Sequence, residues 1–280
     1  MTSPDTAEGG RRIEGARQDA EPPSFDVTVA HPARVYDCLL GGKDNYEVDR
    51  ETARAVISAN PNILPAVRAN RAFLRRAVTY LVEEAGIRQF LDIGTGLPTN
   101  DNTHEVAQSI APESRIVYVD NDPIVLAHAR ALLTSTPEGA TAYFEADAQD
   151  TDTVLRGAAE TLDFSQPVAV MVLCTMQYIP DSDSPHQIVS RLMQAVPSGS
   201  YLTMSDTTSD IDSDRVSQAT GEFNTRRVAA QFTPRTLKEI AGFFDGLDLV
   251  DPGLVAVSHW RTAAGQAPMV SVCGCMGRKP

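Results

Sequence analysis

The stretch QFLDIGTGLPT, residues 89–99, decides the fold that we expect for this chain of 280 residues. Its apolar part, residues 90–93, predicts a short buried strand. Gly94 and Gly96 follow, and glycine permits a tight turn in which the backbone can approach a ligand closely. The stretch therefore predicts a strand that ends in a ligand-binding turn.

A helix should begin soon after this turn. Asn102 and Glu105 have the spacing of a capping box, in which each side chain accepts a hydrogen bond from the other residue's backbone N–H. Pro112 then marks where the helix stops. Strand, glycine turn and helix form the first unit of a nucleotide-binding α/β fold.

A second strand is predicted over residues 115–120, RIVYVD, and it ends on Asp120, 24 residues after Gly96. A carboxylate at this spacing can accept hydrogen bonds from both hydroxyl groups of an adenosine ribose. A glycine turn alone is a weak indication of a nucleoside site, but the turn and the acid together predict one.

At these residues the chain resembles the class I S-adenosylmethionine (SAM)-dependent methyltransferases, which carry an acid two residues before the first glycine. Asp92 occupies that position, and its carboxylate suits the cationic methionine end of SAM. A dinucleotide dehydrogenase would instead carry a glycine at Thr99 and bind a pyrophosphate, which Asp92 would repel. The chain departs from the methyltransferase pattern at Pro98, where a third glycine is frequent.

The resemblance extends over about residues 30–277 to an actinobacterial group of SAM-dependent methyltransferase-like proteins with no assigned substrate. The similar phrases are PARVYDCLLGGKDNY, NRAFLRRAV, FLDIGTGLPT and YVDNDPIVLAHARALL. It implies an α/β fold with a Rossmann-like, seven-stranded methyltransferase sheet, mostly parallel with the last strand antiparallel. It also implies SAM as the cofactor.

Cofactor-binding residues follow from the same resemblance. Asp147, after a predicted strand over residues 140–146, would bond the adenine amine, and Ala148 would offer a backbone amide; the alternative for Asp147 is to cap a helix from Thr151 onward. Arg71 could reach the SAM carboxylate, or simply be exposed on its helix. The full expected set is Arg71, Asp92, Gly94, Thr95, Gly96, Asp120, Asn121, Asp147, Ala148 and Cys174.

Three regions are expected along the chain. Residues 1–24 are polar and rich in glycine and proline, which predicts a disordered tail. Residues 25–86 have helical periodicity at 34–40, 48–59 and 68–85 and should form a helical cap over the carboxyl edge of the sheet. Residues 87–280 should form the SAM-binding domain.

In the rest of that domain we expect strands over residues 168–175, 200–205, 249–260 and 269–276. Helices are expected over 185–196, 213–230 and 233–244, the last capped by Thr233. A turn near Ala264 and Gly265 would reverse the final strand. The acidic stretch 206–214 lacks the glycine and glutamate of a calcium loop, so we expect a solvated loop.

Acceptor-binding residues are sought in two places. The phrase LLGGKDNY is not a phosphate loop, since no Ser or Thr follows its lysine, and it is either an inter-helix turn or a lid in which Tyr36 and Lys43 face the ligands. Tyr178 follows the most apolar strand and should line the acceptor site, whereas Met176 is equally suited to packing. His186 and His259 are candidate bases, although surface or packing roles are commoner for single histidines.

Composition limits the partners and the compartment. The net charge is −13, which disfavours nucleic acid as a partner. Residues 31–90 alone carry a balance of +2 (nine basic against seven acidic residues), which indicates solvated helix faces or an anionic acceptor. The sequence has no secretory signal, no membrane span and no zinc or other metal motif, and its four cysteines favour reduced thiols in the cytoplasm.

The expected function is therefore methyl transfer from SAM to a small-molecule acceptor. The alternatives are a noncatalytic module that binds SAM or S-adenosylhomocysteine (SAH), a nicotinamide-dependent oxidoreductase and an aminopropyltransferase. The acceptor, any catalytic base and the oligomeric state do not follow from these residues.

Overall fold

The structure, a computed structural model, describes residues 26–132, 134–262 and 267–280. The expected tail over residues 1–24 lies outside the described residues, and so does the turn expected near Ala264 and Gly265. No helix in the described ranges combines the length and the apolar character that a membrane crossing requires.

One mixed sheet forms the centre of the molecule, with eight strands in the described part of the chain and the order β3-β2-β1-β4-β5-β8-β6, where β7 pairs with β8. The first five strands are parallel, and β8 runs antiparallel to β5, as expected for the final strand. The strands are β1 (Gln89–Ile93), β2 (Arg115–Asp120), β3 (Ala140–Glu145), β4 (Ala169–Leu173), β5 (Tyr201–Thr207), β6 (Asp248–Leu249), β7 (Val255–Ala256) and β8 (Val272–Arg278).

The strand order places a topological switch between β1 and β4. The chain proceeds from β1 outward through β2 to β3, and then returns to lay β4 on the other side of β1. The loops after β1 and β4 therefore leave the sheet in opposite directions and open a crevice at its carboxyl edge, where open α/β sheets bind their ligands.

Helices cover both faces of the sheet. On one face α3 and α4 pack against Phe90, Ile116 and Met171, and on the other α6 and α7 pack against Leu91 and Val170. The helices are α1 (Pro32–Leu40), α2 (Glu47–Ala59), α3 (Ile63–Glu83), α4 (Thr103–Ile110), α5 (Pro123–Leu132), α6 (Thr151–Ala158), α7 (Pro185–Ala195), α8 (Ser213–Asn224) and α9 (Leu237–Gly242).

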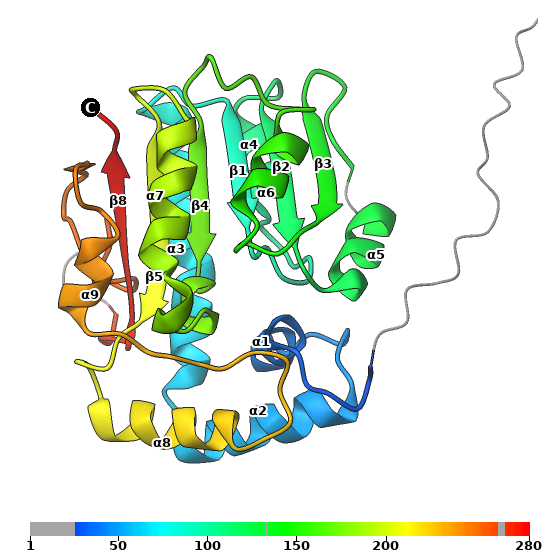
Figure 1. The fold of residues 1–280 in the computed structure, drawn as a ribbon, viewed down its shortest axis with the longest axis vertical. Coiled ribbons are helices and arrows are strands. Elements are labelled where there is room, and N and C mark those ends of the chain that lie inside the picture. Colours follow the sequence, from blue (N-terminus) through cyan, green and yellow to red (C-terminus); the bar gives the residue numbers. More distant parts are fainter. Residues whose placement is uncertain (1–25, 133, 263–266) are drawn as a thin grey trace, which may run out of the picture.

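The N-terminal helices divide between two roles. Figure 1 shows α1, α2 and α8 lying beyond the carboxyl ends of the parallel strands, where the sequence predicted a cap. A separate apolar cluster, including Val35, Val56, Ala219 and Phe223, joins these helices. The helix α3 begins earlier than expected, and Phe73 and the apolar residues after it pack on the sheet face, so α3 belongs to the body as well as to the cap.

The C-terminal part differs most from the sequence prediction. Residues 249–260 form two short strands rather than one, because Pro252 cannot donate to a strand ladder and Gly253 turns the chain with φ +78°. The helix α9 is capped by Thr236, whose side chain accepts from the Glu239 N–H, and not by Thr233. The helix α8 ends at Asn224, well before residue 230.

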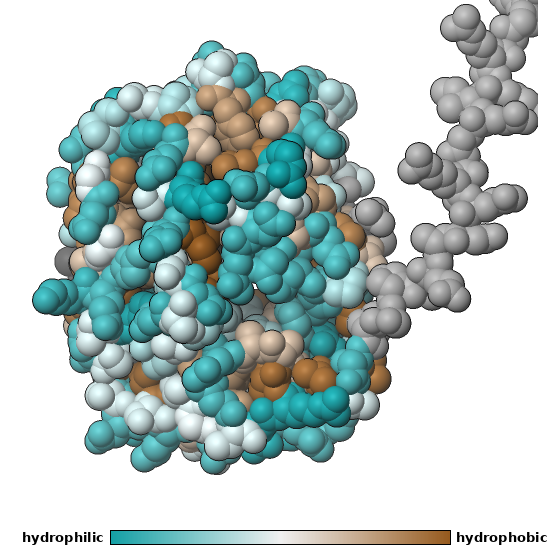
Figure 2. All heavy atoms as spheres, viewed as in Figure 1, coloured by the Kyte–Doolittle hydropathy of each residue, from teal (hydrophilic) through white to brown (hydrophobic). Residues whose placement is uncertain are grey.

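The visible surface is mixed. Figure 2 shows a mostly hydrophilic face with separate hydrophobic patches, some of them over the cap. The large hydrophobic residues that are most exposed, Val27, Ile110, Leu249 and Met269, lie on different elements.

Candidate functional site

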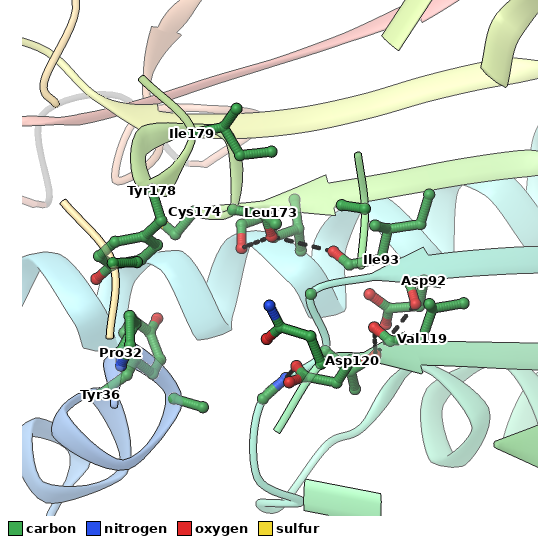
Figure 3. A pocket seen from close by; sticks show the side chains of 18 of the residues that line it. Pro32, Tyr36, Asp92, Ile93, Val119, Asp120, Leu173, Cys174, Tyr178 and Ile179 are labelled. Carbon is green, nitrogen blue, oxygen red and sulfur yellow. Dashed lines mark hydrogen bonds between the residues drawn. The ribbon is translucent and has the colours of Figure 1, made fainter. Parts of the chain in front are cut away.

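A cavity of about 380 Å³ lies at the carboxyl ends of β1, β2 and β4, beside α1. All ten expected cofactor residues line it, and so do Tyr36 and Tyr178. Figure 3 shows the two tyrosines on one side of this cavity and Asp92 and Asp120 on the other. Lys43 is exposed and does not line the cavity, so the structure does not bring this residue to the site.

The glycine turn after β1 forms the floor of the cavity. Gly94 and Gly96 both have φ +68°, a left-handed conformation that other residues adopt at a cost. A side chain on Gly94 would collide with Thr175, which follows β4, whereas a Cβ on Gly96 would find only the Ala33 Cβ at 4.0 Å. Gly94 therefore permits the close approach of two loops, and Gly96 keeps the cavity open toward α1.

Asp120 lies at the end of β2 directly beside this turn. Its Oδ2 accepts from the Gly96 N–H at 2.8 Å, and its Oδ1 accepts from the Asp122 N–H at 3.0 Å. Burial raises the pKa of the carboxyl, and these two hydrogen bonds oppose the shift. A carboxylate offers about four acceptor positions, so two remain for the hydroxyl groups of a ribose.

Asp92 is buried at the opposite side of the turn. It accepts a hydrogen bond from the Thr103 hydroxyl at 2.6 Å. Burial raises its pKa to about 6, although Thr103 and Arg71 act in the other direction. A buried carboxylate of this kind would be stabilised by a cation in the cavity, such as an ammonium or a sulfonium group.

Arg71 projects from α3 to the edge of the cavity. Its guanidinium donates to the backbone carbonyls of Asn100 and Asp101 at 2.9 and 3.1 Å. The side chain is half-buried rather than simply exposed. It could bind a carboxylate through its remaining N–H groups.

At the other end of the cavity, Asp147 and Ala148 follow β3. The Asp147 carboxylate is exposed and accepts from the Gln149 N–H at 2.9 Å. The N-cap of α6 is Asp150, whose Oδ1 accepts from the Thr153 N–H. The alternative of Asp147 as the helix cap is therefore wrong, and its carboxylate is accessible to a ligand.

Tyr36 and the end of β4 are joined by a chain of hydrogen bonds. The Tyr36 hydroxyl donates to the Val67 carbonyl at 3.3 Å and accepts from Asn70 at 3.1 Å. Asn70 in turn accepts from the Ser205 hydroxyl at 2.7 Å, and the Cys174 sulfur lies 3.6 Å from the same hydroxyl. Burial raises the pKa of Tyr36 and brings that of Cys174 to about 12, so both groups are neutral.

A buried arginine holds the segment that carries Tyr178. Arg235 donates to the backbone carbonyls of Met176 and Ile179 at 2.8 and 2.7 Å, and its guanidinium lies 3.3 Å from the Asp206 carboxylate. Asp206 is fully buried within β5 and does not begin a solvated loop, which corrects the sequence prediction at this residue. Its pKa is raised to about 7 by burial, against the effect of Arg235.

Sequence reasoning missed an ionic cluster beside Asp120. The Asp122 carboxylate lies 3.2 Å from the His31 Nδ1 and 3.3 Å from the Arg34 Nε, and Arg34 also approaches Asp49 at 3.8 Å. Asp122 also caps α5, because its Oδ1 accepts from the Ile124 N–H. The ion pairs themselves could not be predicted, because the paired residues lie far apart along the chain and no sequence pattern links them.

The two histidines considered as bases lie elsewhere. His186 stacks on Phe243 with ring centroids 3.8 Å apart, and the Nε2 of His259 lies 2.9 Å from the Ala267 carbonyl oxygen. Neither lines the cavity. Among the described residues, no group of three or more His, Cys, Asp or Glu side chains is arranged to hold a metal ion.

The family model described as "S-adenosyl methyltransferase" matches residues 18–280. The chain belongs to this family. None of the curated proteins matches the chain. This membership agrees with the family resemblance that was based on the glycine turn and Asp120. It identifies SAM as the cofactor.

Two solved structures support the same assignment. A DUF574 family protein from Streptomyces avermitilis is 45% identical with a TM-score of 0.87, over 91% of this chain and 99% of that one. A proposed methyltransferase from Thermobifida fusca is 38% identical with a TM-score of 0.85, over 92% and 98%. The plantazolicin methyltransferase BpumL in complex with SAH shares the fold, with 10% identity and a TM-score of 0.53.

The cavity of this S-adenosyl methyltransferase family member fits the cofactor. The buried carboxylate of Asp92 and the guanidinium of Arg71 suit the ammonium and carboxylate of a methionine moiety. The unused acceptor positions of Asp120 suit ribose hydroxyls, and the accessible Asp147 suits an adenine amine. The residues would hold the cofactor in that order along the cavity.

Proposed function

We propose that this protein transfers the methyl group of SAM to a small-molecule acceptor. The observation that carries the proposal is that ten residues expected to bind the cofactor line one cavity together with Tyr36 and Tyr178. The cavity lies at the switch point of the sheet and under the cap, which together provide room for a cofactor and an acceptor.

SAM supplies a methyl group that is already activated by a positively charged sulfur. The residues of this chain then bind and orient the two substrates. Asp120 binds the ribose of SAM, Asp92 and Arg71 bind its methionine end, and Tyr178 borders the side on which the acceptor lies. Positioning of this kind can supply a large part of the rate acceleration, because the reacting groups no longer lose freedom in the reaction.

Shortly after Tyr178 the cavity lining contains one carboxylate, that of Asp183, which is exposed and accepts a hydrogen bond from the Ser182 hydroxyl. His31 is the one histidine among the described residues that line the cavity, and it lies beside Asp122 near the ribose-binding Asp120. Tyr36 and Tyr178 stay protonated, because burial raises the pKa of each phenol. We therefore assign catalysis mainly to orientation rather than to proton abstraction by His31 or by a tyrosine.

The proposed setting is the cytoplasm, without nucleic-acid partners. Cys38, Cys174, Cys273 and Cys275 are all free thiols, and the net charge is −13. Free buried thiols are typical of a reducing compartment, and the negative surface would repel a phosphate backbone.

Asp120→Ala tests the proposal. Removing the carboxylate should abolish SAH binding in isothermal titration calorimetry while the circular dichroism spectrum stays native, because the ribose loses its acceptor. The control is Glu145→Ala, since Glu145 pairs with Asp120 across the sheet but is exposed and lies outside the cavity. Unchanged affinity in the Asp120 variant would refute the ribose role.

A noncatalytic SAM- or SAH-binding module remains the second candidate, because every cofactor-binding residue named above would serve binding alone. Mass spectrometry of small molecules released from the denatured protein would identify a bound cofactor or product. Turnover of SAM to SAH with any member of an acceptor panel would exclude the module. Fluorescence titration with NADH should show no binding, whereas binding would favour a nicotinamide-dependent oxidoreductase.

A further inference from the structure

A second hollow, of about 50 Å³, lies between the cap helices and the adjoining ends of β5 and β8. We call it the cap chamber; its apolar walls come from α1, α2, α3 and α8 and from the chain after α8, and they include Val35, Val56, Val67, Val216, Ala219 and Phe232. Apart from Phe232, these wall residues are less than a tenth exposed, and Thr207 of β5 and Val272 of β8 complete the lining on the side of the sheet.

The cap chamber adjoins the cofactor cavity. Tyr36, Cys174 and Tyr178 line both spaces. Figure 3 shows these three residues together on one side of the cofactor cavity, away from Asp92 and Asp120. A group held in the chamber would therefore lie next to the place where the end of β4 borders the cofactor.

The lining of the cap chamber is uncharged. None of the described residues that line it is Asp, Glu, Lys, Arg or His. Its polar members are neutral, and Gln177 uses its Oε1 to accept from the N–H and the hydroxyl of Thr207 at 3.0 and 2.8 Å. A charged group would find no partner here and would lose its hydration, which is costly.

The size of the cap chamber limits what it can hold. An engineered cavity that binds benzene measures about 150 Å³, roughly three times the volume of this chamber. A whole aromatic ring would be too large without movement of the walls. A group of a few heavy atoms, such as a short branched alkyl chain, matches the space.

We propose that the cap chamber is the acceptor subsite and that it receives a short, uncharged, apolar group of the methyl acceptor. The substrate class is then a small molecule with such a group close to the atom that is methylated. This inference rests on the proposed methyltransferase function. It excludes an acceptor that places an anionic group in this chamber.

The first test compares probes of equal shape and different charge. Saturation-transfer NMR on the full-length protein with saturating SAH should detect isobutanol, whereas isobutyrate and isobutylammonium should bind at least about tenfold more weakly, since an unpaired charge loses hydration. Absence of isobutanol binding, or equal binding of the charged probes, would overturn the inference.

Two variants of α8 locate the probe. Ala219→Leu should fill the chamber, because Ala219 is buried at its wall, and should abolish the isobutanol signal while SAH affinity stays native. Gln218→Leu is the matched control on the exposed face of the same helix and should change neither signal. Isobutanol binding that survives in the Ala219 variant would contradict the proposed location.

A third variant enlarges the chamber, so its result does not depend on whether the fold tolerates a larger side chain. Phe232→Ala should admit benzyl alcohol, which the native chamber excludes by size. No gain over the native protein would count against the inference. SAH calorimetry on the native protein separates the two proposals. If the native protein does not bind SAH, the proposed function is refuted. If it binds SAH but not isobutanol, only the acceptor role of the chamber is refuted.

Discussion

At the end of β1, the carboxyl group of Asp92 is buried and accepts one hydrogen bond, from Thr103. Its pKa is raised to about 6 from an ordinary value of 3.8, so burial favours the protonated form. Asp92 therefore binds a proton more tightly in the folded chain than in the unfolded chain. Without a ligand, the free energy of unfolding should fall as the pH rises from 3.8 to about 6.

A cationic ligand reverses this preference, because it stabilises the ionised carboxylate. We predict that SAM affinity rises between about pH 5 and 7 as Asp92 ionises. Asp92→Asn should weaken SAM binding and flatten the pH dependence, whereas Asp101→Asn at an exposed position should do neither. Calorimetry across this range measures both effects, and a pH profile unchanged in the Asp92 variant would contradict the assignment.

The two glycines of the turn should respond differently to the same change. Both positions have φ +68°, which costs an alanine about 1–2 kcal/mol. Gly94→Ala also forces its Cβ into the Thr175 side chain, whereas Gly96→Ala meets only open space near Ala33. Urea unfolding should therefore show a larger loss of stability for Gly94→Ala, and equal losses would mean that the Thr175 contact relaxes freely.

At the scale of elements, the ionic cluster of Arg34, Asp49 and Asp122, with the His31 ring beside it, joins α1 and α2 to the start of α5. Arg34, Asp49 and Asp122 are almost fully buried. The Asp122 N–H also donates to Asp120, so the attachment of the cap is linked to the carboxylate for which we propose the ribose-binding role.

Arg34→Met should cost about 3–5 kcal/mol in the free energy of unfolding, because it leaves two buried carboxylates without their partner. The double variant Arg34→Met/Asp122→Asn should lose less than the sum of the single variants, and asparagine can still cap α5. The Arg34 variant should also weaken SAH binding. Arg54→Met, in an exposed ion pair with Glu47, is the control and should change little. Additive losses would show that the cluster does not act as a unit.

At the scale of the whole molecule, the carboxyl edge of the sheet and the cap together line the cavity. The cavity lies between them because the switch point of the sheet opens toward α1. The family match begins at residue 18, and the apolar clusters described above are built from residues 30–276.

Deletion of residues 1–24 should therefore leave the melting temperature and the SAH affinity unchanged, since this stretch is polar and contributes no expected core residue. Differential scanning fluorimetry and calorimetry on the full-length and shortened chains measure both quantities. A clear drop in either would show that the N-terminal stretch contacts the folded part.

Much of the fold could be predicted because it depends on local patterns. The strands β1 and β2 and the capping box of Asn102 and Glu105 follow from short-range signals, and the structure confirms each one. The positions of Gly96 and Asp120 along the chain were sufficient to indicate a nucleoside site, since parallel strands bring their carboxyl ends to one edge.

The sequence by itself determined the sheet, the glycine turn and the acids at the strand ends, because these follow from periodicity and spacing. Only the tertiary structure decided that Lys43 lies away from the cavity, that Arg34 pairs with Asp122 and that α8 closes an uncharged chamber with α2. The physical reason is that such contacts join residues distant in the chain, and packing of the whole molecule selects them rather than any local preference.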